Sequence, residues 1–267
     1  FNIFYFRMTI TIKFNNDIKH TYNSFEQILQ DKDRYHTITY IYCCDNKLFS
    51  LPELPNSLKY LYCSRNSLSS LPKLPNSLKK LFCNNNNISN LPKLPNSFIY
   101  LSCGNNNLSS LPELPNSLTA LYCRHNNLSI LPELPDSLTR LNWSNNNLSS
   151  LPELPNSLDT LWCSYNNLSS LPELPNSLRE LYCDYNSLSN LPELPDSLII
   201  ICYYNNPIHT HIKNYFNGKT KKYYEFNEKM KKLFINKIEN WYLDCKYNPK
   251  YLYCRKRLMK EYEELYG

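Results

Sequence analysis

The chain has 267 residues and a net charge of +6, which is only mildly basic for this length. No apolar run reaches the roughly 18 to 20 residues that a membrane-spanning helix needs, and the first residues lack the order of a secretory signal. These features predict a cytoplasmic protein that is neither transmembrane nor secreted through a signal peptide. The chain begins with Phe1, and Met8 resembles a natural start, so residues 1–7 are an upstream extension, not native to the protein, or the sign of a fragment.

Residues 1–37 precede the repetitive part of the chain and are expected to form a small N-terminal cap. The alternating stretch TITIKF (9–14) predicts a strand, and NSFEQILQD (23–31) predicts a short helix. Ser24 and Gln27 stand three residues apart, which is the spacing of a capping box at the start of a helix.

From residue 38 to residue 208 one unit recurs with a period of 20 residues, L-x-x-L-x-C-x-x-N-x-L-x-x-L-P-x-L-P-x-S. Nine copies of its first half begin at Ile38, Leu58, Leu78, Phe98, Leu118, Leu138, Leu158, Leu178 and Leu198. A fixed period of this length indicates a stacked solenoid, because one unit buries its apolar side only against its neighbours.

Each position of the unit has a physical role. The alternation Leu61-Tyr62-Cys63 has a period of two and predicts a short strand with Leu61 and Cys63 on the buried side. Proline donates no backbone hydrogen bond, so LPxLP is expected to run extended and polyproline-like on the outer arc. The predicted fold is a solenoid with parallel β-strands on its concave face and this extended segment on its convex arc.

An asparagine follows every predicted strand, at Asn46, Asn66, Asn86, Asn106, Asn126, Asn146, Asn166, Asn186 and Asn206. Its side-chain amide can bond backbone groups of its own coil and of the next one. Buried backbone groups need such partners, so this column is assigned a structural role and no binding role.

The unit is the leucine-rich repeat pattern, and it resembles the 20-residue class of bacterial effector proteins, whose repeats carry the same LPxLP. The resemblance covers about residues 38–208 and implies the leucine-rich repeat solenoid. Related effectors can carry a catalytic ubiquitin-ligase domain beyond their repeats. The remaining 59 residues here are too short for that domain and do not resemble it, so that activity is not expected.

The source of the chain is also suggested by resemblance. Its composition, rich in Asn, Lys, Ile and Tyr, looks like that of an AT-rich genome. The ending WYLDCKYNPKYLYCRKRLMKEYEELYG is similar to the ends of several mimivirus-type proteins. Together these features resemble an uncharacterised leucine-rich repeat protein of a giant virus.

Residues 209–267 depart from the repeat and carry the basic charge of the chain. They hold 14 Lys or Arg and seven Asp or Glu, a net +7 against +6 for the whole chain. Apolar residues at helical spacing predict two helices, broken at Asn248-Pro249. This segment is expected to form a basic C-terminal helical cap on the last coil.

The cysteines raise the question of a metal or redox site. Seven of the 11 lie in one column of the repeat, at Cys43, Cys63, Cys83, Cys103, Cys123, Cys163 and Cys183. Metal ligands converge on one point, whereas neighbouring parallel strands point their side chains the same way, and cysteine also packs well as a small apolar residue. Packing is therefore the favoured reading, and no metal, cofactor or catalytic residue is predicted.

The outward positions of the strands vary, and many are aromatic. Large amphipathic rings are typical of interface hot spots, although rings on adjacent strands also stack on one another for structural reasons. The residues predicted to bind a partner on the concave face are Tyr42, Tyr60, Tyr62, Phe82, Tyr100, Tyr122, Arg124, Arg140, Trp162, Tyr165, Tyr182 and Tyr185.

Three functions are compatible with these features. The first is a non-enzymatic, monomeric scaffold that binds a host or viral protein partner on the concave face. The second is a substrate-recognition adaptor in a ubiquitin-ligase pathway. The third is nucleic-acid binding through the basic C-terminal segment, where charge and aromatic residues interleave. This third function ranks below the others, because acidic residues dilute the basic charge and capping explains the aromatic residues.

Overall fold

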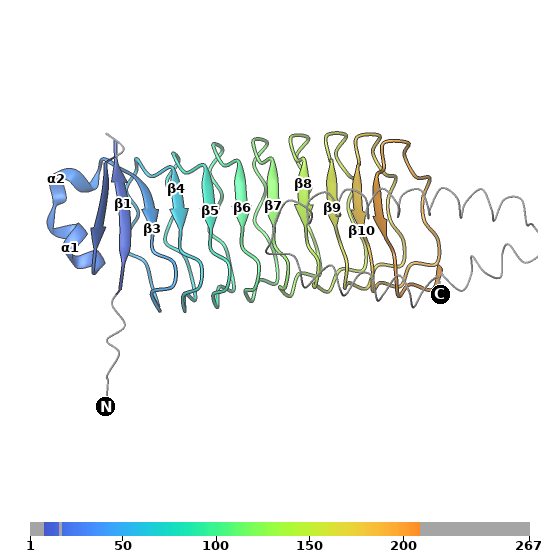
Figure 1. Ribbon diagram of the computed structural model, residues 1–267, viewed down its shortest axis with the longest axis horizontal. Coiled ribbons are helices and arrows are strands. Elements are labelled where there is room, and N and C mark those ends of the chain that lie inside the picture. The colour runs from blue at the N-terminus through green and yellow to red at the C-terminus, as the bar shows by residue number, and fades with distance from the viewer. Residues whose placement is uncertain (1–7, 16–17, 209–267) are drawn as a thin grey trace, which may run out of the picture.

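The computed structural model describes residues 8–15 and 18–208, and these form one elongated solenoid (Figure 1). Nine short parallel strands lie side by side along it, joined by eight arcs. They are β3 (Ile38–Tyr42), β4 (Tyr60–Tyr62), β5 (Lys80–Phe82), β6 (Tyr100–Ser102), β7 (Ala120–Tyr122), β8 (Arg140–Asn142), β9 (Thr160–Trp162), β10 (Glu180–Tyr182) and β11 (Ile200–Cys202). The predicted stack of parallel strands is confirmed.

The register of the sheet follows directly from the period of the sequence. Tyr60 pairs with Lys80 and Leu61 pairs with Leu81, and the same 20-residue offset holds between all neighbouring parallel strands. Equivalent positions of successive repeats therefore form straight columns across the sheet.

The core lies behind the sheet and is built from the leucine and cysteine columns. Leu58, Leu61, Cys63 and Leu68 are fully buried, and their equivalents along the stack are buried as well, except Tyr203 in the last coil, which is partly buried. A buried leucine side chain contributes about 1.5–3 kcal/mol relative to an exposed one. Because each leucine contacts the next coil, this contribution depends on the neighbouring repeats being present.

The arcs between the strands run extended and contain no helix, as the prolines predict. A tight turn ends each arc, where the N–H of Leu58 donates to the carbonyl of Pro55 over 3.0 Å. The serine of each LPxLPxS segment ties the coils together, since the Ser77 hydroxyl donates to the Leu58 carbonyl of the preceding coil over 2.6 Å. This role of the serine is not predicted from the sequence.

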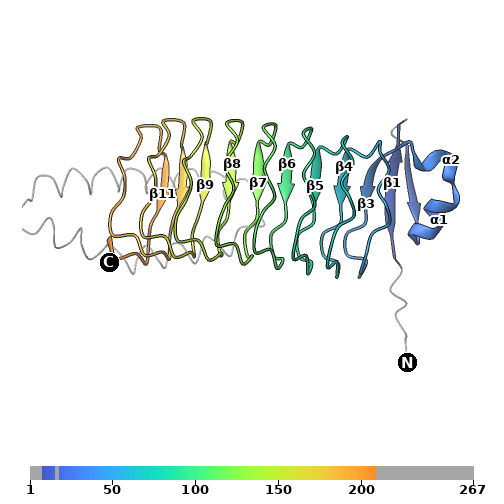
Figure 2. The same ribbon diagram turned by 180° about the vertical axis from the view of Figure 1, so that it is seen from behind.

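The N-terminal cap is an antiparallel extension of the same sheet. It consists of β1 (Ile10–Phe14), β2 (Lys19–Tyr22), α1 (Phe25–Gln30) and α2 (Lys32–Tyr35). β1 pairs antiparallel with both β3 and β2, so the sheet has 11 strands, and the two helices lie at its end (Figure 2). The strand at 9–14 and the helix within 23–31 agree with prediction, whereas β2, α2 and the antiparallel pairing were not foreseen.

The asparagine column fastens this cap to the first coil. The Asn46 amide oxygen accepts from the N–H of Thr9 over 2.7 Å, and its nitrogen donates to the Thr9 carbonyl over 2.9 Å. β1 thus occupies the position that a preceding repeat would have. The expected capping box is partly present: Ser24 accepts from the N–H of Gln27, but the Gln27 side chain accepts from Asn23, one residue before the cap.

The expected C-terminal cap, residues 209–267, lies outside the described residues, as do residues 1–7. The division into segments 1–37, 38–208 and 209–267 stays a prediction. Within the described part of the chain, every helix is too short and too polar to span a bilayer.

Candidate functional site

The side of the sheet that faces away from the core is the candidate site, and we call it the open face. It is formed by the first and third residues of each short strand, while the middle residue is buried. Side chains of these two columns contact one another across the strands, which places them on the same surface. Their aromatic members are Tyr40, Tyr42, Tyr60, Tyr62, Phe82, Tyr100, Tyr122, Trp162 and Tyr182.

The rings form a continuous row from β3 to β10. Tyr62 and Phe82 are stacked with ring centroids 4.5 Å apart and planes inclined by 6°. Phe82 and Tyr100 follow at 4.8 Å, and Tyr100 and Tyr122 at 5.5 Å. Stacked and tilted pairs in this range contribute about 0.5–1.5 kcal/mol beyond their buried area. The row therefore stabilises the sheet, whatever else it binds.

Two strands supply no ring at the third position, and neighbours bridge both gaps. On β6 that position is Ser102, which is buried, and Tyr100 from the first position joins the row instead. On β8 it is Asn142, and Tyr122 reaches Trp162 across it with centroids 6.2 Å apart. The row ends with Trp162 and Tyr182 at 6.0 Å.

Two cationic side chains, Lys80 and Arg140, lie near these rings, and a third, Arg124, follows β7. The Lys80 Nζ stands 6.0 Å from the centroid of the Tyr100 ring. Arg140 lies close enough to Tyr100 to oppose the rise in the pKa of its hydroxyl, which burial causes. Arg124 packs its stem against Gly104, where a Cβ atom would stand 3.1 Å from the Arg124 Cγ, so the glycine leaves room for this side chain.

Tyr165 and Tyr185, two members of the predicted partner-binding set, lie outside the strands. They follow the strands, in a turn column where every repeat has positive φ: Asp45, Arg65, Asn85, Asn105, His125, Asn145, Tyr165, Tyr185 and Asn205. Their rings stack at 4.2 Å, and both remain about half exposed, at 48% and 46%. The two tyrosines therefore form a separate pair at the edge of the open face.

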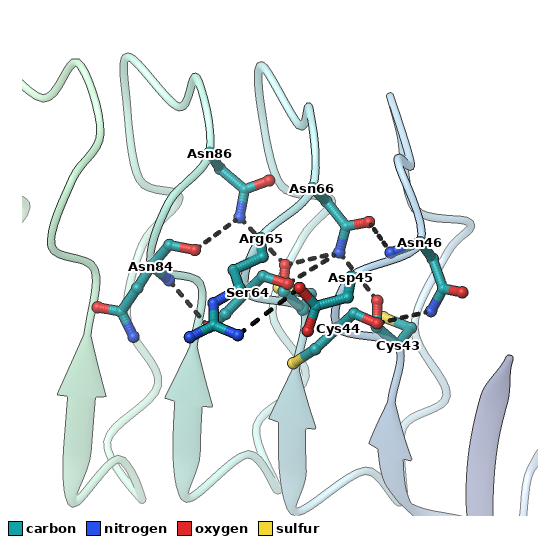
Figure 3. A network of polar contacts seen from close by, with 10 residues as sticks. Cys43, Cys44, Asp45, Asn46, Ser64, Arg65, Asn66, Asn84 and Asn86 are labelled. Atoms are coloured by element: carbon teal, nitrogen blue, oxygen red, sulfur yellow. Dashed lines mark hydrogen bonds and ion pairs between the residues drawn. The ribbon is translucent and has the colours of Figure 1, made fainter. Parts of the chain in front are cut away.

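The asparagine column links neighbouring coils just beyond the ends of the strands (Figure 3). The Asn66 amide donates to the carbonyls of Cys63 and Cys43 over 3.0 Å and 2.9 Å and accepts from the N–H of Leu48 over 2.9 Å. The side chain of Asn66 thus bonds its own coil and the preceding coil, whereas bonds to its own coil and the next one were expected. In front of this network, Arg65 pairs with Asp45 at 3.7 Å.

The cysteine column is buried, and burial sets its chemistry. Desolvation raises the pKa of Cys83 and of Cys123 to about 12, so both thiols stay protonated at neutral pH. Protonated, buried thiols are poor nucleophiles and poor metal ligands. Among the described residues, no three His, Cys, Asp or Glu side chains gather as a metal site would require.

Comparisons with known proteins agree with this architecture. The sequence profile described as Leucine Rich Repeat matches residues 137–158. The leucine-rich effector YopM of Yersinia pestis is 41% identical over 66% of this chain and 50% of its own, with a TM-score of 0.61. YopM of Yersinia enterocolitica is 36% identical over 63% of this chain and 47% of its own, with a TM-score of 0.50.

A Shigella effector leucine-rich repeat domain is 30% identical over 72% of this chain and 78% of its own, with a TM-score of 0.47. The chain spans about half the length of the two YopM structures. A comparison with curated protein sequences finds no match. The fold is thus that of a leucine-rich repeat protein with bacterial effectors among its structural neighbours.

Proposed function

We propose that this leucine-rich repeat protein is a non-enzymatic scaffold that binds a protein partner on the open face of its sheet. The observation that carries the proposal is the continuous row of aromatic side chains from β3 to β10, which remains partly exposed. The buried leucines and asparagines explain the fold, but they do not require aromatic residues at the outward positions of the strands.

The stacking of the rings on one another is also structural, so their mutual contact alone does not require a partner. Exposure gives a further argument for a partner. Tyr42, at one end of the row, is 39% exposed, and the other rings of the row are partly exposed. Tyrosine and tryptophan provide large contact areas at low entropic cost, which is why they dominate interface hot spots.

The proposal is tested by affinity capture from lysate of the cells that express the protein. We expect a specific partner to be lost when Tyr62, Tyr122 and Trp162 are all replaced by alanine, because these rings lie on three different strands of the row. The matched control replaces Glu113, Glu133 and Glu153, which are exposed on the arcs, by alanine. Circular dichroism and urea unfolding of each protein verify that it folds.

Equal capture by the aromatic triple variant and the wild type would mean that the rings serve the sheet alone. Recovery of ubiquitin-ligase components with the wild type would favour the adaptor function. The giant-virus source rests on the sequence resemblance and composition, and the cytoplasmic location rests on the sequence features of the N-terminus and the lack of a long apolar run. Immunofluorescence microscopy of virus-infected cells would test both.

A further inference from the structure

The charge on the open face is unevenly distributed along the solenoid. From β4 to β8 this face carries Lys80 on β5, Arg140 on β8 and Arg124 just after β7. No Asp or Glu lies in residues 59–65 or in the equivalent segments up to 139–145. Lys59 and Lys79 stand exposed directly before β4 and β5. We call this part of the open face, with its rings Tyr60, Tyr62, Phe82, Tyr100 and Tyr122, the basic aromatic patch.

The sign reverses beyond β8. Glu180 and Asp184 lie on β10 and just after it, and Asp159 precedes β9. The Asp184 carboxylate already accepts from the N–H of Tyr204 over 2.9 Å and from the Ser164 hydroxyl over 3.3 Å. The charge on the open face is therefore asymmetric. Cations without an acidic partner lie between β4 and β8, and acidic residues lie from β9 onward, where Asp184 accepts hydrogen bonds from within the chain.

The cations of the patch have no acidic partner within the described chain. The ion pairs of the described residues join Arg34 to Asp31, Arg65 to Asp45 and Arg179 to Asp159. Lys80, Arg124 and Arg140 take part in none of these pairs. Three uncompensated cations around partly buried rings produce a positive potential that favours an anionic ligand.

The orientation of the rings selects among anionic ligands. Tyr62 stacks on Phe82 and Phe82 stacks on Tyr100, while Tyr100 and Tyr122 are tilted by 33°, so each of these rings turns a π-face toward a neighbouring ring. What remains accessible is their edges, which carry the positive end of the ring quadrupole, and the tyrosine hydroxyls, which donate hydrogen bonds. Nucleobases require free ring faces on which to stack, whereas carboxylates are bound by edges, hydroxyls and cations.

We propose that the basic aromatic patch binds an extended acidic segment of the partner protein. This inference rests on the proposed function and specifies the chemistry of the partner. The patch covers four inter-strand spacings, about 19 Å at ~4.8 Å each, and about six residues of extended chain span that distance.

The test measures binding of a fluorescein-labelled peptide with about six consecutive glutamates by fluorescence anisotropy at low salt. The variant Lys80→Glu/Arg140→Glu reverses two charges within the patch. The matched control Lys73→Glu/Lys93→Glu makes the same change in net charge on the exposed arcs. Arg124→Glu is a further patch variant, and an oligouridylate of similar length is the competing ligand.

We expect the acidic peptide to bind the wild type and the arc variant alike, and the patch variants at least about tenfold more weakly, since like charges now face the ligand. Equal loss in the arc and patch variants, or no loss in either, would refute the patch as the site. Tighter binding of the oligouridylate, lost in the patch variants, would also overturn it. If a captured partner depends on the rings but not on Lys80 and Arg140, the scaffold function stands and this inference fails.

Discussion

At the scale of single residues, the asparagine column does most to fix the conformation. Asn106 is buried, and its amide donates to the carbonyls of Cys83 and Cys103 over 3.0 Å each and accepts from the N–H of Ile88 over 3.0 Å. These backbone groups belong to two coils and their bonds to Asn106 are buried. A buried backbone group without a partner costs about 1–3 kcal/mol.

The substitution Asn106→Ala is therefore expected to lower the free energy of unfolding by about 3 kcal/mol, because several backbone groups lose their partner together. The neighbouring Asn107 is exposed, and Asn107→Ala should change stability by less than about 0.5 kcal/mol. Urea unfolding followed by circular dichroism measures both. If Asn106→Ala and Asn107→Ala lowered the free energy of unfolding by similar amounts, the buried hydrogen bonds of Asn106 would not be the cause of its contribution to stability.

The positive-φ column is a second residue-scale feature, and it could be recognised only in part from the sequence. Asn and Asp tolerate this conformation, and they occupy positions 45, 85, 105, 145 and 205. Arg65, His125, Tyr165 and Tyr185 adopt it too, although larger side chains favour it less. Their conformation is imposed by the neighbouring coils, which a residue-by-residue preference does not contain.

At the scale of elements, a strand of three residues has little stability of its own and depends on its two neighbours. The repeat made these strands predictable, because an alternating triplet flanked by fixed leucines recurs at one phase. The N-terminal cap occurs once, so no repetition reinforced its signals. β2 (KHTY) lacks the apolar alternation of a half-buried strand and was not predicted.

The sequence predicts those residues of the candidate site whose position is set by the 20-residue period. It does not predict the contacts that depend on side-chain conformation. Tyr62, Phe82, Tyr122, Trp162 and Tyr182 lie in the row as the period indicates. The bridging of Asn142 by Trp162 and the cation positions depend on side-chain conformations. Cys202 occupies an outward position in the sequence pattern but is buried.

The cysteine column gives the strands a dependence on pH. Thiols ordinarily ionise with a pKa of 9.0, and burial raises the pKa of Cys83 and Cys123 to about 12. Between these values the unfolded chain releases protons and the folded chain does not. The free energy of unfolding therefore falls as pH rises, whereas below the ordinary value the stabilisation is complete.

We expect Cys83→Ala/Cys123→Ala to unfold with a shallower loss of stability between about pH 9 and about pH 11, because each buried thiol contributes about 1.4 kcal/mol per pH unit there. Ile88→Val serves as control, since it perturbs the same core without removing an ionisable group. Urea unfolding over this pH range gives the slopes. An unchanged slope in the cysteine variant would mean that the thiols already ionise in the folded chain.

At the scale of the whole molecule, the solenoid behaves as a one-dimensional stack. Its coils contact their neighbours through leucine packing, asparagine and serine bonds and parallel pairing, and each of these contacts recurs every 20 residues. Stability is then approximately a sum over repeats and their interfaces. The protein should therefore still fold after deletion of one repeat, provided that the chain is rejoined at equivalent positions of two repeats.

Deletion of residues 127–146 joins Asn126 to Asn147, two residues that follow each other in phase, so the remaining coils keep their register. We expect this variant to fold cooperatively, with a lower free energy of unfolding and a smaller urea m-value, because one interface fewer is exposed on unfolding. Deletion of residues 127–136 removes more than half of the connection between β7 and β8 but keeps both strands. The remaining connection is too short for the chain to return to the start of the next strand, so the stack should not form beyond β7.

The 20-residue deletion also tests the open face, because it removes Arg140 and Asn142 and brings Tyr122 and Trp162 onto adjacent strands. The ring row should close its gap, while the basic aromatic patch loses one of its three cations. Capture of a partner that needs only the rings should survive, and binding of the glutamate peptide should weaken. A folded deletion variant that binds the peptide unchanged would contradict the role of Arg140, and an unfolded one would contradict the additive stack.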